Sequence, residues 1–370
     1  MSCIKQISLL VLALVTVGCI ARSGTGALDS VEKRVWVTGD QERDRVGVLD
    51  SDTGTIHWVK LPEQPGKIYA LLPSPHGRYV AILSNPITYT VSIYTIVSVS
   101  DTEWDLQPYT SLVGYAGAQW SPDSDELLLW RSYWDSPEIW QASSNKVEPT
   151  ITESGICSAT WGRDSQQVVV SFCMGDRRLI AWSRSDQTQT LLLKFSFQVD
   201  ERYAVHALIS GRSPDRQLLL LDLNLSDKDM TGREIEPPVL LEHKYALFDL
   251  ENYVYQLIPI TVYGYPSYHA WINAHQLFIV SPLTSPTAIH NYKYIVFNAQ
   301  TGHLEQVLTK DSSCMTAVSN IPDDHNSVLL KYHPCVENSL DGMYRLDLVT
   351  GKRTRLDIEY EETLSFLMMK

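Results

Sequence analysis

Histidine, cysteine and serine could give this chain metal or nucleophilic chemistry, but their spacing favours neither. The sequence contains no Gly-x-Ser-x-Gly, His-Glu-x-x-His or Cys-x-x-Cys motif and no glycine-rich phosphate loop. His333 and Cys335 lie two residues apart, as neighbours on one face of a strand do. We therefore expect no metal and no other cofactor. Paired carboxylates for glycoside cleavage could come from separate repeats, so a lyase or glycosidase stays an open alternative.

Disulfide formation is the chemistry that the spacing does favour. Four cysteines outside the amino-terminal segment are available, namely Cys157, Cys173, Cys314 and Cys335. The first two are centred on the turn-like segment 162–165 and the last two on the turn-like segment 322–326. If each turn joins two antiparallel strands without a bulge, the members of a pair lie opposite one another, with Cβ atoms about 4.5–5.5 Å apart. We predict disulfides within both pairs, which require an oxidising compartment.

Aromatic and charged side chains between the strand-like runs are the candidates for binding. They concentrate in segments 130–138, 263–269 and 281–293, and a long charged insertion covers 224–243. Loops on a rigid scaffold commonly carry recognition, and Tyr, Trp and Arg are enriched at binding hot spots. The alternative is that individual rings pack between repeats. The candidate binding residues are Trp130, Arg131, Tyr133, Trp134, Tyr263, Tyr265, Tyr268, His269, His290 and Tyr292.

The elements that must position these side chains are short apolar runs of the strand type, and no amphipathic helix longer than two turns is indicated. A Ser-Pro turn precedes one run at 74–77, 121–124 and 213–216, with variants at 162–165, 273–275 and 321–324. The average spacing is about 49 residues. Proline at the second position of the turn fixes φ, as a type I turn requires.

A second turn, Asp/Asn-x-x-Thr-Gly, recurs half a repeat later at 50–54, 298–302 and 347–351. Its glycine supplies the left-handed residue that a short hairpin needs. Asp50 and Asp52 could suggest a calcium loop, but Gly54 comes one position too early and no glutamate stands at the twelfth position. The turn interpretation covers all three copies, so we prefer it.

Two hairpin turns per repeat indicate four strands, the size of a β-propeller blade. Three runs between residues 35 and 59 and one run at 363–368 would complete a seventh blade from both ends of the chain. We predict an all-β propeller of seven four-stranded blades closed by pairing of the N- and C-terminal strands, with six or eight blades as alternatives. Loops between second and third strands and crossovers between blades emerge together on what we call the loop-rich face. Complete blades are expected at roughly 67–107, 115–152, 155–195, 203–262, 268–309 and 314–358.

The Ser-Pro-Asp-x turn before an apolar strand, as at 121–124 and 213–216, resembles the repeat of TolB-like and related WD-like propellers of exported bacterial proteins. The resemblance covers about 300 residues but rests on short motifs, and the Trp-Asp and Gly-His signatures of eukaryotic WD repeats are absent. It implies the propeller fold and leaves the binding partner open.

The amino end has the features of an export signal. Lys5 precedes an apolar run from residue 7 to 17, which is too short to span a bilayer. Gly18 and Cys19 resemble a bacterial lipobox, although Thr16 stands where that motif usually has Leu. The resemblance implies cleavage before Cys19 and lipid attachment to its thiol; ordinary secretion is the alternative. We expect residues 1–18 to be the signal, 19–33 a tether and 34–370 a single propeller domain.

Composition limits the function further. The chain has 370 residues, 44% of them hydrophobic, and a formal net charge of −13, which excludes nucleic acid as a favoured partner. We expect an exported monomer, anchored by lipid to the membrane or outer envelope surface, that binds another envelope protein or a peptide without catalysis. A glycan on the same face is the second possibility.

Overall fold

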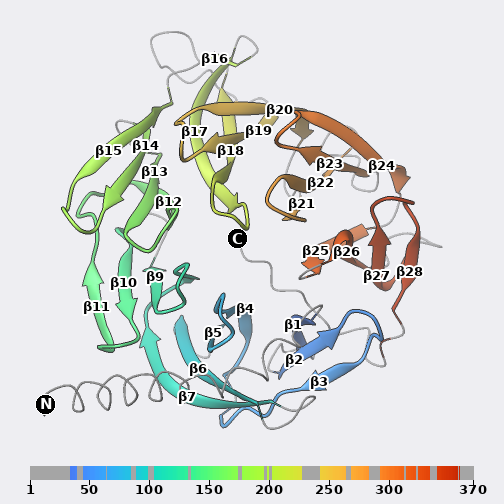
Figure 1. The fold of residues 1–370 in the computed structure, drawn as a ribbon, viewed down its shortest axis with the longest axis horizontal. Helices are drawn as coiled ribbons and strands as arrows, with labels where there is room; N and C mark the ends of the chain where they lie inside the picture. The colour runs from blue at the N-terminus through green and yellow to red at the C-terminus, as the bar shows by residue number, and fades with distance from the viewer. Residues whose placement is uncertain are drawn as a thin grey trace, which may run out of the picture.

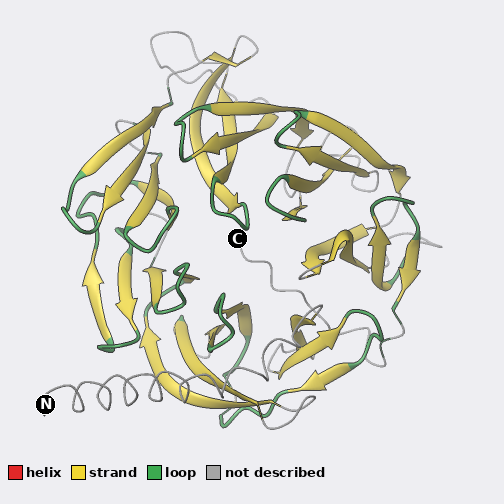
Figure 2. Ribbon diagram, in the orientation of Figure 1, coloured by secondary structure: helices red, strands yellow, loops and turns green. Residues whose placement is uncertain are grey.

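The fold is a ring of seven β-sheets around a central axis, drawn in Figure 1 and coloured by element type in Figure 2. The description comes from a computed structural model. In the described part of the chain the regular elements are strands, and no helix there is long and apolar enough to cross a membrane. The described residues are 34–358 without 40–44, 64, 85–88, 99–103, 132–134, 174–176, 196–197, 200–201, 227–241, 264–267, 283–291, 312–313, 322–323, 334–339 and 357.

Each sheet is one blade, and consecutive strands within it pair antiparallel. Blade by blade, the strands are β1 (Arg34–Gly39), β2 (Arg45–Asp50), β3 (Ile56–Trp58); β4 (Ile68–Pro73), β5 (Tyr79–Ser84), β6 (Thr90–Ser98), β7 (Trp104–Val113); β8 (Gly117–Trp120), β9 (Glu126–Trp130), β10 (Glu138–Gln141), β11 (Lys146–Pro149); β12 (Ile156–Trp161), β13 (Gln167–Phe172), β14 (Arg178–Ser183), β15 (Gln189–Lys194); β16 (Gln198–Val199), β17 (Arg202–Arg212), β18 (Leu218–Ser226), β19 (Glu242–Asp249), β20 (Tyr255–Tyr263); β21 (Tyr268–Trp271), β22 (Gln276–Pro282), β23 (Tyr292–Asn298), β24 (His303–Asp311); β25 (Cys314–Ile321), β26 (Asp324–His333), β27 (Gly342–Asp347) and β28 (Arg353–Arg355).

The prediction of a seven-bladed propeller is confirmed, with one correction to the strand count. The fifth blade has five strands, because the two-residue β16 pairs with the start of β17. The first blade shows three strands, β1 to β3, as expected from the runs between residues 35 and 59. The predicted closing strand at 363–368 lies outside the described residues.

The ring closes by packing between the first and last blades. Val37 of β1 and Leu49 of β2 share one buried cluster with Leu329 and Met343 of the seventh blade. Arg345 adds a polar clamp, with Nη1 2.7 Å from Asp52 Oδ1 and Nη2 2.5 Å from Asp324 Oδ2. Apolar burial and an ion-paired clamp therefore join the two ends of the described chain.

Strand alternation gives the ring two faces. Turns between first and second strands, and between third and fourth strands, emerge on one side, which we call the turn face. The remaining loops and the crossovers form the loop-rich face, as predicted. Several turns of the turn face reach toward the ring centre in Figure 1.

The Ser-Pro turns take the predicted conformation. The Ser121 hydroxyl accepts the Glu126 amide at 3.0 Å, and the Ser213 hydroxyl accepts the Leu218 amide at 2.9 Å. The residue three positions after the serine is left-handed, with φ of +66° at Ser124 and +65° at Arg216. A side chain thus satisfies an amide at the start of the next strand, which fixes the register of the hairpin.

The Asp/Asn-x-x-Thr-Gly segments are hairpin turns with a left-handed glycine, as predicted, and their first residue also makes an Asx turn. Asp347 Oδ1 accepts the amides of Val349 at 3.0 Å and Thr350 at 2.7 Å. Asp50 and Asn298 accept the equivalent amides. A further copy of this turn begins at Asp249. The sequence pattern missed it because Tyr253 (φ +57°) stands where the other copies have glycine.

Tryptophans at the ends of innermost strands join neighbouring blades. Trp120 Nε1 donates to the Leu72 carbonyl at 2.6 Å, and Trp161 Nε1 donates to the Gln119 carbonyl at 2.9 Å. Both indoles are buried, so each hydrogen bond forms away from water. Losing such a bond would leave a buried donor or acceptor without a partner, which lowers stability.

The Cys157–Cys173 disulfide is present, with a Cα–Cα distance of 5.7 Å. The two cysteines are not simply opposite one another as predicted, because a register shift between Ile156 and Ser158 places Cys157 in a bulge. In the seventh blade Cys314 pairs with His333 across β25 and β26. Cys335 lies outside the described residues, so the second disulfide remains a prediction.

Candidate binding face

The described part of the loop-rich face brings two of the candidate residues together at the third blade. Trp130 ends β9 and Arg131 follows it. Tyr133, Trp134, Tyr265 and His290 lie outside the described residues, as does Cys19. Tyr263 and Tyr268 lie at the ends of β20 and β21 that border this face. The candidate binding site described below lies on the second, third and fourth blades.

Arg131 is held by a polar and aromatic unit. Its guanidinium carbon lies 4.4 Å from the centre of the Tyr115 ring, and Nη2 lies 3.0 Å from both Tyr115 Oη and Glu138 Oε2. The Tyr115 hydroxyl also donates to Glu138 Oε2. Burial, followed by the hydrogen bond and charge of Glu138, raises the pKa of Tyr115 to about 12, so its hydroxyl stays a donor. About half of the Arg131 side chain remains exposed to solvent.

Trp130 is positioned by a glycine on the neighbouring strand. A Cβ on Gly117 would lie 2.1 Å from Trp130 Cε2, so only glycine leaves room for the indole in this position. Gly117 is directly opposite Trp130 in the pairing of β8 with β9. The close approach fixes the indole against β8.

Two exposed tyrosines that the sequence did not single out lie on the same face of the second blade. Tyr69 near the start of β4 is 40% exposed and Tyr89 just before β6 is 49% exposed, with ring centres 6.1 Å apart. Lys67 Nζ lies 5.9 Å from the centre of the Tyr69 ring. Sequence pattern could not find this pair, because a tyrosine at the end of a strand is equally compatible with the core.

The tyrosine pair of the second blade and the Arg131 unit of the third blade are connected through Gly114. Its amide donates to the Tyr89 carbonyl at 2.7 Å, and a Cβ on it would lie 3.2 Å from Arg131 Nη1. The backbone is left-handed there, with φ of +90°. We call Tyr69, Tyr89, Trp130 and Arg131, together with the buried Tyr115 that supports Arg131, the aromatic patch. A cation and several rings on a supported backbone can stack on, and donate hydrogen bonds to, a ligand.

The fourth blade extends this face with a second supported arginine. Arg178 at the start of β14 is ion-paired with Glu153 of the preceding crossover, and its guanidinium carbon lies 4.4 Å from the centre of the Phe172 ring. The Ser136 hydroxyl donates to the Glu153 carbonyl at 2.9 Å. The third and fourth blades are thus joined by polar contacts at this rim.

His269 and Tyr292 occupy seams between blades. His269 Nε2 donates to the Ser210 carbonyl at 3.0 Å, and its ring centre lies 6.1 Å from that of Tyr245. Tyr292 is 9% exposed in the core shared by the sixth and seventh blades, and burial raises its pKa. This corrects the expectation that Tyr292 is displayed for binding, because the apolar neighbours on both blades cover it.

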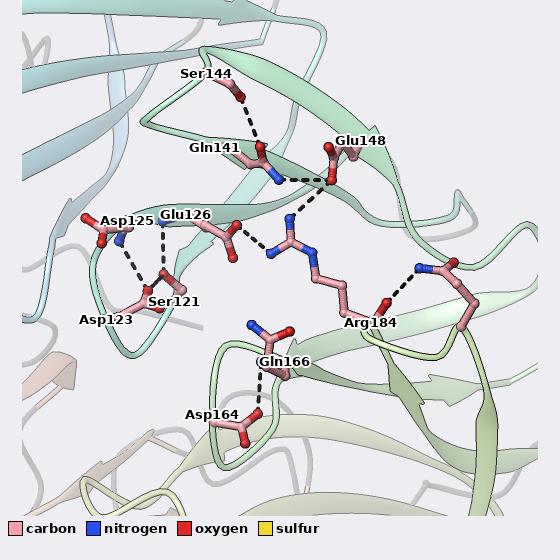
Figure 3. Close-up of polar contacts among 11 residues, drawn as sticks. Ser121, Asp123, Asp125, Glu126, Gln141, Ser144, Glu148, Asp164, Gln166 and Arg184 are labelled. Carbon is pink, nitrogen blue, oxygen red and sulfur yellow. Dashed lines mark hydrogen bonds and ion pairs between the residues drawn. The ribbon is translucent and has the colours of Figure 1, made fainter.

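The turn face carries a charged cluster at the junction of the third and fourth blades (Figure 3). Arg184 Nη1 lies 2.5 Å from Glu126 Oε1 and Nη2 lies 3.2 Å from Glu148 Oε2, which also accepts a bond from Gln141 at 3.0 Å. Burial raises the pKa of Glu126 above its usual value, and the hydrogen bond and charge of Arg184 offset this only in part. The single guanidinium of Arg184 on the fourth blade pairs with both carboxylates of the third blade, so we assign this cluster to holding the two blades together.

By fold the chain belongs among the β-propellers. No protein-family model matches it, and no curated protein matches it either. A Lactobacillus plantarum protein structure is similar with a TM-score of 0.57 and 13% identity, over 90% of this chain and 98% of that one. An oligogalacturonate lyase in complex with manganese has a TM-score of 0.53 and 12% identity, over 88% and 85% of the two chains.

TolB from Acinetobacter baumannii also matches, with a TM-score of 0.47 and 15% identity over 75% of this chain. The matched region spans 63% of that TolB chain. The two likenesses with TM-scores above 0.5 describe the fold alone, and a propeller supports many unrelated functions. The function must therefore be argued from the face itself.

Proposed function

We propose that this protein is a non-catalytic propeller that binds another envelope protein or a peptide through the aromatic patch. The observation that carries the proposal is the exposed Tyr69–Tyr89 pair beside the supported Arg131. Tyr, Trp and Arg dominate binding hot spots, because they bury much area and still donate hydrogen bonds. Strand ends fix these side chains before a partner arrives, so binding would order few of them.

We also propose that the protein acts outside the cytoplasm, with Cys19 as its lipid attachment site. The Cys157–Cys173 disulfide supports this location, since such bonds persist in oxidising compartments. A lipid anchor would hold the propeller near envelope partners, raising their effective concentration at the membrane.

A glycan is the second candidate ligand for the same patch. Tyr69 and Tyr89 present exposed rings, and such rings can stack on the apolar faces of sugars. A protein or peptide is preferred because Arg131 and Glu138 add paired charges beside the rings, as in the polar rim of a protein interface.

The test is capture of partners by the tagged full-length protein from its native envelope, with Tyr89→Ala and Arg131→Ala compared with the unaltered protein. Tyr253→Ala is the matched control, because Tyr253 is 51% exposed, close to the 49% of Tyr89, but lies in a turn of the opposite face. We expect one reproducible protein to be retained by the control and reduced about tenfold or more by each patch variant.

Equal recovery from all four proteins would contradict the proposed face. Loss of a polysaccharide rather than a protein from the patch variants would assign the patch to glycan binding. Circular dichroism of each variant ensures that the comparison is made between folded proteins.

A further inference from the structure

Arg212 ends β17 and Arg216 lies in the turn between β17 and β18, which reaches toward the centre of the ring in Figure 1. Arg212 Nη1 donates to the carbonyls of Trp161 at 2.9 Å and Gly162 at 3.0 Å. Arg216 Nη2 donates to the Pro122 carbonyl of the third blade at 3.0 Å. These acceptors are neutral, and neither arginine is ion-paired with a carboxylate in the described part of the chain.

The two positive charges are close enough to affect one another. Burial, and then the charge of Arg216, lowers the pKa of Arg212 to about 10, so the group is still charged at neutral pH. A buried charge without a counter-ion is costly, and the cost falls when an anion binds. Carboxylates are in excess in this protein, which has a net charge of −13, yet none of those described is ion-paired with either arginine.

The carboxylate that follows Pro122 in the third-blade turn is already engaged. Asp123 Oδ1 accepts the Ser121 hydroxyl at 2.5 Å and the Asp125 amide at 3.3 Å. Burial raises the pKa of Asp123, but these bonds and one from Ser165 lower it overall. Asp123 therefore completes its own turn, and no contact joins it to the guanidinium of Arg216.

Arg216 occupies the left-handed position of its turn, with φ of +65°, as Ser124 does in the third blade with φ of +66° and Gly77 does in the second. The left-handed conformation costs a residue with a side chain about 1 kcal/mol of conformational energy, and glycine does not have this cost. The left-handed backbone therefore belongs to the turn, and the case for a binding site rests on the two guanidinium groups, which contact neutral carbonyls.

We propose that Arg212 and Arg216 form a binding site for an oxyanion, a carboxylate or a phosphate, at the turn-face end of the central channel. Each guanidinium keeps free N–H groups beyond those bonded to carbonyls, and their planar fork fits two oxygens of either anion. The site lies on the face opposite the aromatic patch, so it is independent of the proposed protein partner.

The test is isothermal titration of the full-length protein with inorganic phosphate and, separately, with malonate, at constant ionic strength set by sodium chloride. We expect a Kd of about 1 mM or tighter for at least one anion. Arg216→Gln should weaken it about tenfold, as expected for a lost charge-assisted bond. Arg163→Gln is the matched control, because Arg163 lies in the neighbouring turn but is paired with Glu251 at 3.5 Å.

Binding of phosphate alone would assign a phosphate ligand, and binding of malonate alone a carboxylate. Failure of both anions to bind, or equal affinity in Arg216→Gln and the unaltered protein, would overturn the proposal. Arg216→Lys, which keeps the charge without the fork, should give an intermediate affinity. Equal loss in the Arg163→Gln control would show a general charge effect and would also overturn it.

Discussion

Left-handed backbone at non-glycine residues marks the tightest turns of this propeller. In the described chain these residues are Ser124, Asn145, Gln187, Arg216 and Tyr253. Tyr253 is the bulkiest of them, and its ring is half exposed, so little burial offsets the strain. We predict that Tyr253→Asn stabilises the protein by about 0.5–1 kcal/mol, because asparagine tolerates this conformation. Urea unfolding measures the change, and a loss of stability would show that the tyrosine ring contributes packing instead.

The Asx turns give a prediction for pH. The backbone amide of Thr350, and then its hydroxyl, lower the pKa of Asp347 below its usual value. Such a carboxylate stabilises the fold above its ordinary pKa of about 4, and the contribution is lost as pH falls through the lower folded value. Asp347→Asn should therefore be less stable than the unaltered protein at pH 7, with the difference shrinking below about pH 4. Denaturation midpoints from pH 3 to 7 measure this; a constant difference would rule out the carboxylate as the cause.

At the scale of the element, the tryptophans that end the innermost strands are not equivalent. Trp161 donates to a carbonyl of the preceding blade, whereas Trp271 Nε1 is buried without a partner among the described residues. The strand facing Trp271 has a register shift between Ile209 and Gly211, and His269 takes the Ser210 carbonyl there. The bulge thus replaces the indole contact with a histidine contact at this seam.

We therefore predict that Trp161→Phe costs about 1 kcal/mol more than Trp271→Phe, the net worth of one buried hydrogen bond. Both changes remove similar ring volume from a buried site, so the pair serves as its own control. Equal costs in chemical denaturation, or a larger cost at Trp271, would contradict this explanation.

Element types and turn chemistry could be predicted from sequence because they depend on local pattern. Proline in the 121–124 turn and glycine in the 347–351 turn specify their backbone directly. The bulge at Cys157 and the two-residue β16 could not be predicted, since they arise from pairing with other strands. Exposure of Tyr69 and burial of Tyr292 also depend on which blades pack together, so local sequence pattern could not predict them.

At the scale of the whole molecule, the ring depends on the seam between the first and seventh blades. Arg345 clamps Asp52 and the nearly buried Asp324, whose side chain is 9% exposed. Arg345→Ala should cost about 1–3 kcal/mol, because it leaves the Asp324 carboxylate poorly solvated. The control is Arg78→Ala, since Arg78 and Asp125 are both about half exposed and such pairs contribute less than about 1 kcal/mol. A smaller cost for Arg345→Ala than for Arg78→Ala in urea unfolding would contradict the clamp.

The central claim is that the loop-rich face is the surface that binds an envelope partner, and two exposed lysines test it directly. Lys67 lies beside Tyr69 on this face, and Lys352 lies in a turn of the opposite face. The measurement is amine-reactive cross-linking of the protein in its native envelope, followed by mass spectrometry. We predict that Lys67 is joined to one reproducible protein and Lys352 is not. Links to that protein from Lys352 but not Lys67, or no link to any other protein, would contradict the claim.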